Sequence, residues 1–269
     1  MYVVIAGLCV VFMMPLAWLV STSLKVSGQE FTFPPQWIPK PVAWENYVKI
    51  FQIPALPFGR FMINTIFIVI VNMIGGLTTA TLVAYSFARL RYPGRDFFFG
   101  LCISTMMLPG IVTLIPTYLL WSQLKLVDTF FPLTVPAFFG GGAFFIFLTR
   151  QFFMGLPYEL EEAARLDGAS SFRIWWNVML PLSGPVIAAM AIFSFQSHWN
   201  EFLAPLIYLN TREKFTMAIG LRAMQGMYGG EWNQIMAAAT VMVIPVIILF
   251  FSAQRYFMRG IALTGLAGR

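Results

Sequence analysis

The chain contains little charge. Only 10% of its 269 residues are Asp, Glu, Lys or Arg, whereas a soluble domain typically carries about 25%. Because a surface in water needs charge to stay solvated, this shortage excludes an ordinary soluble domain. Hydrophobic residues make up 59% of the chain, so the composition predicts an integral membrane protein.

Residue types that perform chemistry are also scarce. The two cysteines, Cys9 and Cys102, lie in apolar runs, so we expect neither a structural disulfide nor a metal site. His198 is the single histidine, and no His-Glu-x-x-His pattern occurs, which argues against an intramembrane enzyme. The sequence also has no Gly-x-x-x-x-Gly-Lys-Ser/Thr loop for ATP phosphates. We therefore predict no catalytic residues, no bound metal and no cofactor in this chain.

Long apolar stretches are the main feature that is present. About 20 apolar residues are needed for a helix to cross the hydrocarbon core, and such a helix satisfies its own backbone hydrogen bonds in lipid. The sequence therefore predicts an all-α membrane protein with six transmembrane helices, at about residues 1–23, 61–87, 96–119, 134–155, 185–208 and 235–256.

We expect residues 1–60 to form an N-terminal transmembrane helix and a long extracytoplasmic loop, and residues 61–269 to form a five-helix core. The first apolar run is also compatible with a cleaved signal peptide. It lacks a basic leading region and a small-x-small cleavage site. An anchor helix is therefore the favoured interpretation.

Helix-breaking residues lie inside several predicted spans. Pro109 and Pro116 fall in the third span, Pro245 falls in the sixth, and three glycines at 140–142 open the fourth. Small residues allow helices to approach closely, and proline removes an intrahelical hydrogen bond. Two interpretations remain open: ordinary packing and kinking, or bent helices that rock against a partner.

Basic residues predict the orientation of the chain in the membrane. The short loop at 88–95 contains Arg89, Arg91 and Arg95, and short cytoplasmic loops are enriched in Lys and Arg. We therefore expect both termini and the loop at 156–184 to lie in the cytoplasm.

The loop at 156–184 is long and polar for this chain. Pro157 stands where a helix can begin, and acidic residues in its first turns complement the helix dipole: Glu159, Glu161 and Glu162. Gly168 permits a turn, and a second short helix is expected from about Ser170, stopping before Pro181. The first of these helices is expected to be short, acidic and small-faced, a shape that suits docking into a cleft on another protein. The alternative is a surface helix that lies at the membrane interface.

These residues resemble a known family motif. Glu162-Ala163-Ala164, Gly168 and Leu180-Pro181 match the spacing of the EAA loop of ABC importer permeases. Val178 stands where isoleucine is usual, which is a mild departure. Together with the long first outer loop and the residues Trp199, Asn200, Glu201 and Phe202, the chain resembles the second permease subunit of carbohydrate importers of the maltose-transporter type.

The resemblance implies the fold of a type I ABC importer permease in a bacterial or archaeal plasma (inner) membrane, crossing it several times. It implies four kinds of partner: a second permease subunit, two ATPase subunits that bind ATP and magnesium, an extracytoplasmic solute-binding protein, and membrane lipid. The implied solute is an oligosaccharide, sugar or polyol. The alternatives are a non-sugar solute such as glycerol phosphate, or an ATP-independent carrier.

In this family the EAA loop forms the helix that couples the permease to an ATPase. Carried over by position, the resemblance assigns the ATPase-coupling contacts and the shape of the loop to Glu162, Ala163, Ala164, Asp167, Gly168, Leu180 and Pro181.

Polar residues in the fifth span form a second candidate site. Ionisable residues within a membrane are costly and often line a pathway, so His198, Asn200 and Glu201 are candidates for the translocation path or a gate. A count of about 1.5 Å per residue from Pro185 places Glu201 toward the outer third of the bilayer. The alternative is a buried polar group paired with a neighbouring helix.

Overall fold

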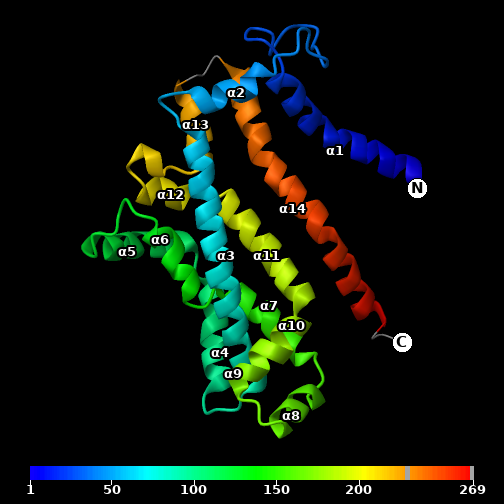
Figure 1. The fold of residues 1–269 in the computed structure, drawn as a ribbon, viewed down its shortest axis with the longest axis vertical. Helices are drawn as coiled ribbons and strands as arrows, with labels where there is room; N and C mark the ends of the chain where they lie inside the picture. The colour runs from blue at the N-terminus through cyan, green and yellow to red at the C-terminus, as the bar shows by residue number, and fades with distance from the viewer. Residues whose placement is uncertain (228–230, 267–269) are drawn as a thin grey trace. The chain divides into compact units, whose positions relative to one another are not determined.

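The computed structural model describes residues 1–227 and 231–266, and their regular structure is entirely helical (Figure 1). The prediction of an all-α protein is confirmed for these residues. The helices are α1 (Tyr2–Ser23), α2 (Glu45–Gln52), α3 (Phe58–Arg89), α4 (Arg95–Ser104), η1 (Thr105–Met107), α5 (Gly110–Gln123), α6 (Phe131–Thr134), η2 (Val135–Phe138), α7 (Ala143–Met154), α8 (Glu159–Leu166), α9 (Ser171–Ile174), η3 (Trp175–Met179), α10 (Leu180–Leu182), α11 (Gly184–Trp199), α12 (Leu203–Tyr208), η4 (Arg212–Lys214), α13 (Met217–Met227) and α14 (Trp232–Leu266).

By length and composition, four stretches of the described residues are able to cross a membrane: α1, α3, residues 131–154 and residues 232–252. Two further pairs of helices qualify only as bent pairs, which brings the count to as many as six. These stretches overlap all six apolar segments of the sequence. Three of the segments differ from the straight helices that we expected: the third and the fifth are bent, and the fourth is interrupted at residues 139–142.

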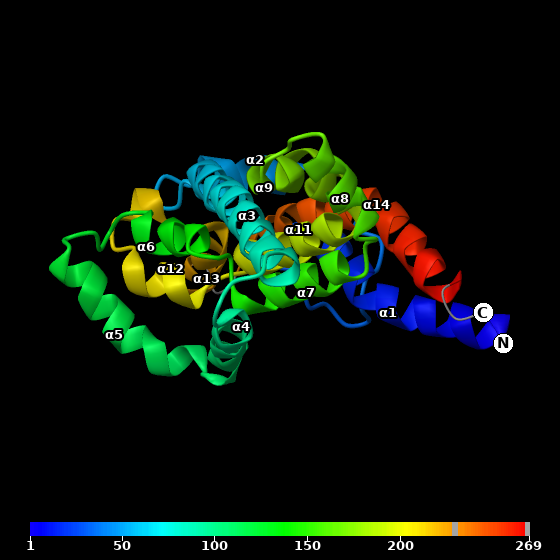
Figure 2. The ribbon, with the colours of Figure 1, turned by 90° about the horizontal axis from the view of Figure 1, so that it is seen from below.

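The third segment bends by 99° between residues 95–107 and 110–123. Leu108 and Pro109 have extended backbone, with ψ of 118° and 132°. The ring of a proline disfavours helical backbone at the residue before it, so Pro109 accounts for the break. Figure 2 shows α4 and α5 running in different directions from this point.

The fifth segment is also not one straight helix. Residues 171–182 and 184–199 meet at 81°, α11 ends at Trp199, and α12 begins at Leu203. Glu201 lies in the interruption between α11 and α12. A count of residues from Pro185 therefore follows a helix only as far as Trp199, and the depth of Glu201 in the membrane stays a prediction.

We expected the short helix after Ser170 to stop before Pro181, but the helical backbone continues past this residue. Helical backbone runs through α9, η3 and α10 to Leu182, with Pro181 inside α10. η3 is a π-helical turn in which the amide of Leu180 donates to the carbonyl of Trp175. Proline has no amide to donate, and this change of register directly before Pro181 lets the helix accommodate it.

Packing divides the chain into two compact units. One consists of Met1–Thr65 and Asn210–Ile248, and the other of Ile66–Leu209 and Leu249–Arg269. These ranges differ from the expected domains at 1–60 and 61–269, which stay a prediction about sequence organisation.

The first unit is held together by buried polar contacts. The side-chain amide of Asn46 donates to the carbonyls of Ser23 and Lys25, at 2.9 Å each. The side chain of Asn64 donates to the carbonyls of Glu213 and Phe215. Because both asparagines are buried, each satisfies main-chain acceptors that water cannot reach.

The second unit has a hydrophobic core built from the C-terminal part of α3 and from the helices α7, α9, η3 and α11. Its buried residues are Ala80, Ala84, Tyr85, Phe87, Ala88, Ile146, Phe153, Ile174, Trp175, Met179, Val186 and Met190. In Figure 1 the short helices α8, α9 and α10 lie at the same end of this unit as the C-terminus of α3. This end holds the segment that the sequence singled out.

Candidate functional site

The polar segment at 156–184 contains the helix α8, Glu159–Leu166, with three acidic residues in its first turn. Its two faces differ in exposure. Glu161 is only 4% exposed, whereas Glu162 and Ala163 are exposed and Leu166 is 89% exposed. The helix therefore presents a small-residue acidic face, with a leucine at its end, away from the rest of its unit.

Gly168 forms the turn that ends α8. Its φ is +77°, a backbone conformation that glycine adopts readily and most other residues do not. The amide of Gly168 donates to the carbonyl of Arg165 and the amide of Ala169 to that of Ala164, both at 3.0 Å. A Cβ at Gly168 would meet no atom within 4 Å, so backbone conformation, and not space, makes glycine suitable here.

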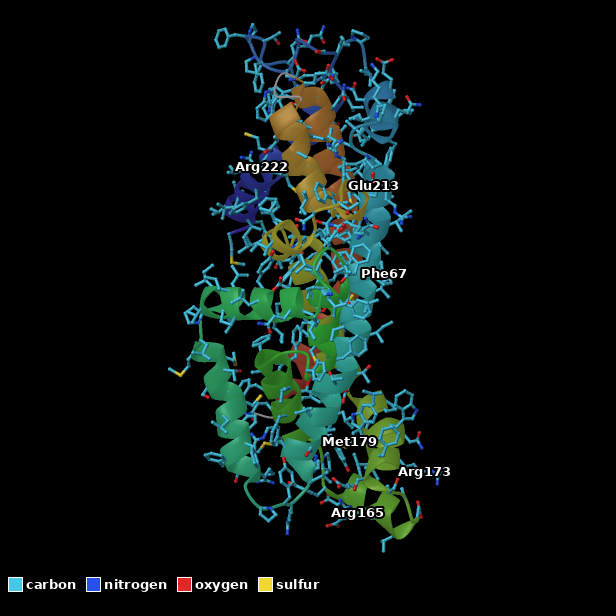
Figure 3. The ribbon with its side chains drawn as sticks, turned by 90° about the vertical axis from the view of Figure 1, so that its left-hand side faces the viewer. Phe67, Arg165, Arg173, Met179, Glu213 and Arg222 are labelled. Atoms are coloured by element: carbon cyan, nitrogen blue, oxygen red, sulfur yellow. The ribbon has the colours of Figure 1, made fainter. Side chains whose placement is uncertain are left out.

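The next helix, α9, begins directly after this turn. The side-chain oxygen of Ser170 accepts from the amide of Arg173 and caps the helix. Figure 3 shows Arg165 of α8 and Arg173 of α9 at this end of the unit. The predicted sequence of helix, glycine turn and helix is therefore confirmed, apart from the point at which the second helix ends.

On the buried side of α8, Glu161 forms an ion pair and a further hydrogen bond. Oε1 of Glu161 accepts from Nη2 of Arg165 at 2.7 Å, one turn along the helix. The same oxygen accepts from the hydroxyl of Tyr85 in α3, at 3.2 Å. The hydrogen bond and negative charge of Glu161 raise the pKa of Arg165. Glu161 thereby joins α8 to α3.

Arg89, the last residue of α3, makes contacts that the sequence did not predict. Its Nη2 donates to the carbonyls of Phe153 and Leu156, where α7 ends. Its guanidinium also lies 4.2 Å from the centre of the Tyr158 ring, directly before α8. In the sequence Arg89 is an arginine at the end of an apolar stretch. Such a position indicates how the chain is oriented in the membrane, but it does not indicate contacts with other segments.

The residues predicted to couple to an ATPase lie in three environments. Glu162, Ala163, Asp167 and Gly168 are exposed along α8 and the turn after it. Ala164 and Leu180 are half-buried, and both pack against the hydrophobic core of their unit. Pro181 is exposed in α10. The structure thus brings the first four together on one surface and anchors that surface through Ala164 and Leu180.

The residues predicted to line a path or gate make local contacts. The side chain of Asn200 donates to the carbonyl of Gln196 at 2.9 Å. Oε1 of Glu201 accepts from the amide of Ala204 at 3.1 Å, which satisfies a free amide at the start of α12. His198 is half-buried. Asn200 is exposed and bonds only one turn back along the chain, so these contacts do not select a buried pair with a neighbouring helix. A role of the three residues in transport stays a prediction.

Comparison with known sequences identifies relatives along most of the chain. Residues 76–263 match the family described as binding-protein-dependent transport system inner membrane component. The arabinooligosaccharides transport system permease protein AraQ of Halalkalibacterium halodurans is 36% identical over 248 residues, covering 92% of this chain and 86% of that protein. The sn-glycerol-3-phosphate transport system permease protein UgpE of Yersinia pestis is 36% identical over 264 residues, covering 96% and 92%.

Solved structures share the fold. One chain in the crystal structure of a bacterial ABC transporter involved in the import of the acidic polysaccharide alginate superposes with a TM-score of 0.84 at 25% identity, covering 95% of this chain and 94% of that one. A chain of the bacterial alginate ABC transporter in complex with an alginate pentasaccharide-bound periplasmic protein gives a TM-score of 0.67 at 16% identity, covering 96% and 94%. The chain belongs to the family of binding-protein-dependent transport system inner membrane components.

Proposed function

We propose that the chain is a permease subunit of an ATP-driven, binding-protein-dependent importer, and that it couples the translocation path to a separate ATPase through α8. The observation that supports this most directly is the exposed acidic, small-residue face of α8, followed by the Gly168 turn. A short helix with such a face fits a cleft on a partner protein. The family and its relatives support the importer role.

The proposed mechanism places ATP chemistry outside this chain. Its sequence has no loop of the Gly-x-x-x-x-Gly-Lys-Ser/Thr type, so two partner ATPase subunits bind ATP and magnesium and hydrolyse the nucleotide. Their closure moves α8 and the coupling helix of a second permease subunit. The packed helices then rock as rigid bodies between inward-open and outward-open states, and a solute-binding protein delivers the solute.

We further propose six spans with both termini in the cytoplasm. The two bent pairs then count as one span each, and α8 lies on the cytoplasmic side together with Arg89, Arg91 and Arg95. The basic loop at 88–95 supports this orientation. The protein accordingly resides in a bacterial or archaeal plasma membrane.

We propose a carbohydrate as the solute. AraQ and the alginate transporter, by their names, handle oligosaccharides or polysaccharides. A second candidate is glycerol phosphate, because UgpE is equally identical to this chain at 36%. The two candidates differ in charge and size, so competition experiments separate them.

The test is uptake by the purified importer in proteoliposomes, with its ATPase subunits, second permease and binding protein. We expect uptake of a labelled oligosaccharide that requires both ATP and the binding protein, with unlabelled sn-glycerol-3-phosphate failing to compete. Competition by glycerol phosphate and not by oligosaccharide would select the second candidate. Uptake without ATP would refute the importer role and select an ATP-independent carrier.

A further inference from the structure

Arg89 connects the end of α3 to the end of α7. Arg89 is only 5% exposed. Its Nη2 donates to the carbonyls of both Phe153 and Leu156. Carbonyls at the C-terminus of a helix lack intrahelical partners and favour a positive charge. The guanidinium of Arg89 therefore binds at the end of α7, where the segment that leads to α8 begins.

The same guanidinium also contacts the start of α8. It lies 4.2 Å from the centre of the Tyr158 ring, and the carbonyl of Tyr158 accepts the amides of Glu161 and Glu162 that open the helix. A planar guanidinium can stack on a ring and bond to carbonyls at its edge, which a lysine ammonium cannot reproduce. One side chain thus holds both ends of the α7–α8 connection.

A second link runs one turn earlier on α3. Tyr85 and Arg89 are four residues apart, so they lie on the same helix face, and the hydroxyl of Tyr85 donates to Oε1 of Glu161. An open groove of about 620 Å³ is lined by Arg89, Tyr158 and Glu161, among others. This groove lies between the end of α3 and α8. The hydrogen bond from Tyr85 to Glu161 and the contact of Arg89 with Tyr158 connect the two segments beside it.

We propose that Arg89 and Tyr85 are positioning residues that make α8 and α3 move as one body, so that displacement of α8 by the ATPase reaches the membrane-spanning helix α3. This inference rests on the proposed coupling function of α8. The contacts of Arg89 with Phe153, Leu156 and Tyr158 are the observations that support its positioning role.

The experiment measures solute uptake and ATP hydrolysis in the reconstituted importer with Arg89→Ala, Arg89→Lys and Tyr85→Phe. Arg91→Ala is the matched control, because Arg91 is exposed near the same helix end. We expect Arg89→Ala to co-purify with the ATPase subunits and to lower uptake per ATP hydrolysed about tenfold, within the range of coupling between linked sites. Arg89→Lys should recover only part of this loss, and Tyr85→Phe should lose less than Arg89→Ala.

Unchanged uptake per ATP in Arg89→Ala would overturn the proposal, as would an equal loss in Arg91→Ala. Should Arg89→Ala fail to assemble, Tyr85→Phe decides, because removing one hydroxyl leaves the packing intact: a normal ratio contradicts the proposal and a lowered ratio supports it. The wild-type complex separates the two hypotheses. If its own uptake is independent of ATP, the coupling function of α8 is wrong, whereas coupled wild-type uptake with normal variants refutes only the positioning role.

Discussion

Gly141 lies directly against the backbone of Gly76 in α3. A Cβ built on Gly141 would stand 2.9 Å from the Cα of Gly76 and closer still to its carbonyl group. Real Cβ atoms essentially never come within 3.0 Å of another residue's atoms. The chain at 140–142, between η2 and α7, therefore packs against α3 backbone to backbone. All three glycines there have positive φ, so they interrupt the fourth predicted span and do not simply open it.

Replacing Gly141 by alanine should destabilise the protein more than the same change at Gly142. Both residues have positive φ, of +64° and +100°, so both variants incur backbone strain of about 1–3 kcal/mol. Only Gly141 adds a clash, since a Cβ at Gly142 meets no atom within 4 Å. Thermal unfolding in detergent should show a lower Tm for Gly141→Ala than for Gly142→Ala, and equal values would contradict the close approach to Gly76.

Replacing Gly168 by valine should uncouple transport from ATP hydrolysis. At φ of +77° a β-branched residue is strained, so the turn after α8 changes shape while membrane insertion is retained. Asparagine tolerates this conformation, which makes Gly168→Asn the matched control. We expect Gly168→Val to hydrolyse ATP with little uptake and Gly168→Asn to remain coupled.

Normal transport by Gly168→Val would argue against the coupling role of this turn. Equal losses in both variants would show that the surface tolerates no side chain at this position, independently of backbone conformation. Uptake and hydrolysis measured on the same proteoliposomes distinguish these outcomes.

Removing the side chain of Asn46 should destabilise the first unit. Its amide serves the buried carbonyls of Ser23 and Lys25, and an unpaired buried acceptor costs about 1–3 kcal/mol. Asn46→Ala should therefore lower the Tm clearly. The neighbouring Glu45 makes an exposed ion pair with Lys49, and such pairs contribute little, so Glu45→Ala should leave the Tm unchanged. The same Tm for both variants would contradict a buried role for Asn46.

The sequence was informative about features that depend on local composition. Apolar stretches marked every helix able to cross a membrane, and Pro109 marked the site of a break. The glycine turn at Gly168 was predictable because few other residues adopt its conformation. The size of each bend was not predictable, since a proline shows where a helix can break but not the direction that packing then selects.

Long-range contacts could not be read from the sequence. Arg89 and Leu156 are 67 residues apart, and Tyr85 and Glu161 are 76 apart, so no periodic pattern relates them. The end of α11 at Trp199, directly before Asn200 and Glu201, was likewise not predicted. In each case the missing information was tertiary packing and not residue type.

The most direct test of the coupling role is a crosslink from the end of α8 to the ATPase. Leu166 is 89% exposed, so Leu166→Cys, in a background with Cys9→Ser and Cys102→Ser, offers one reactive thiol at this surface. With a short bifunctional thiol-to-amine reagent in membranes that contain the whole importer, we predict a product with the combined mass of the permease and one ATPase subunit. Phe31→Cys, exposed in the expected extracytoplasmic loop, should give no such product. A product from Phe31→Cys and none from Leu166→Cys would contradict the account.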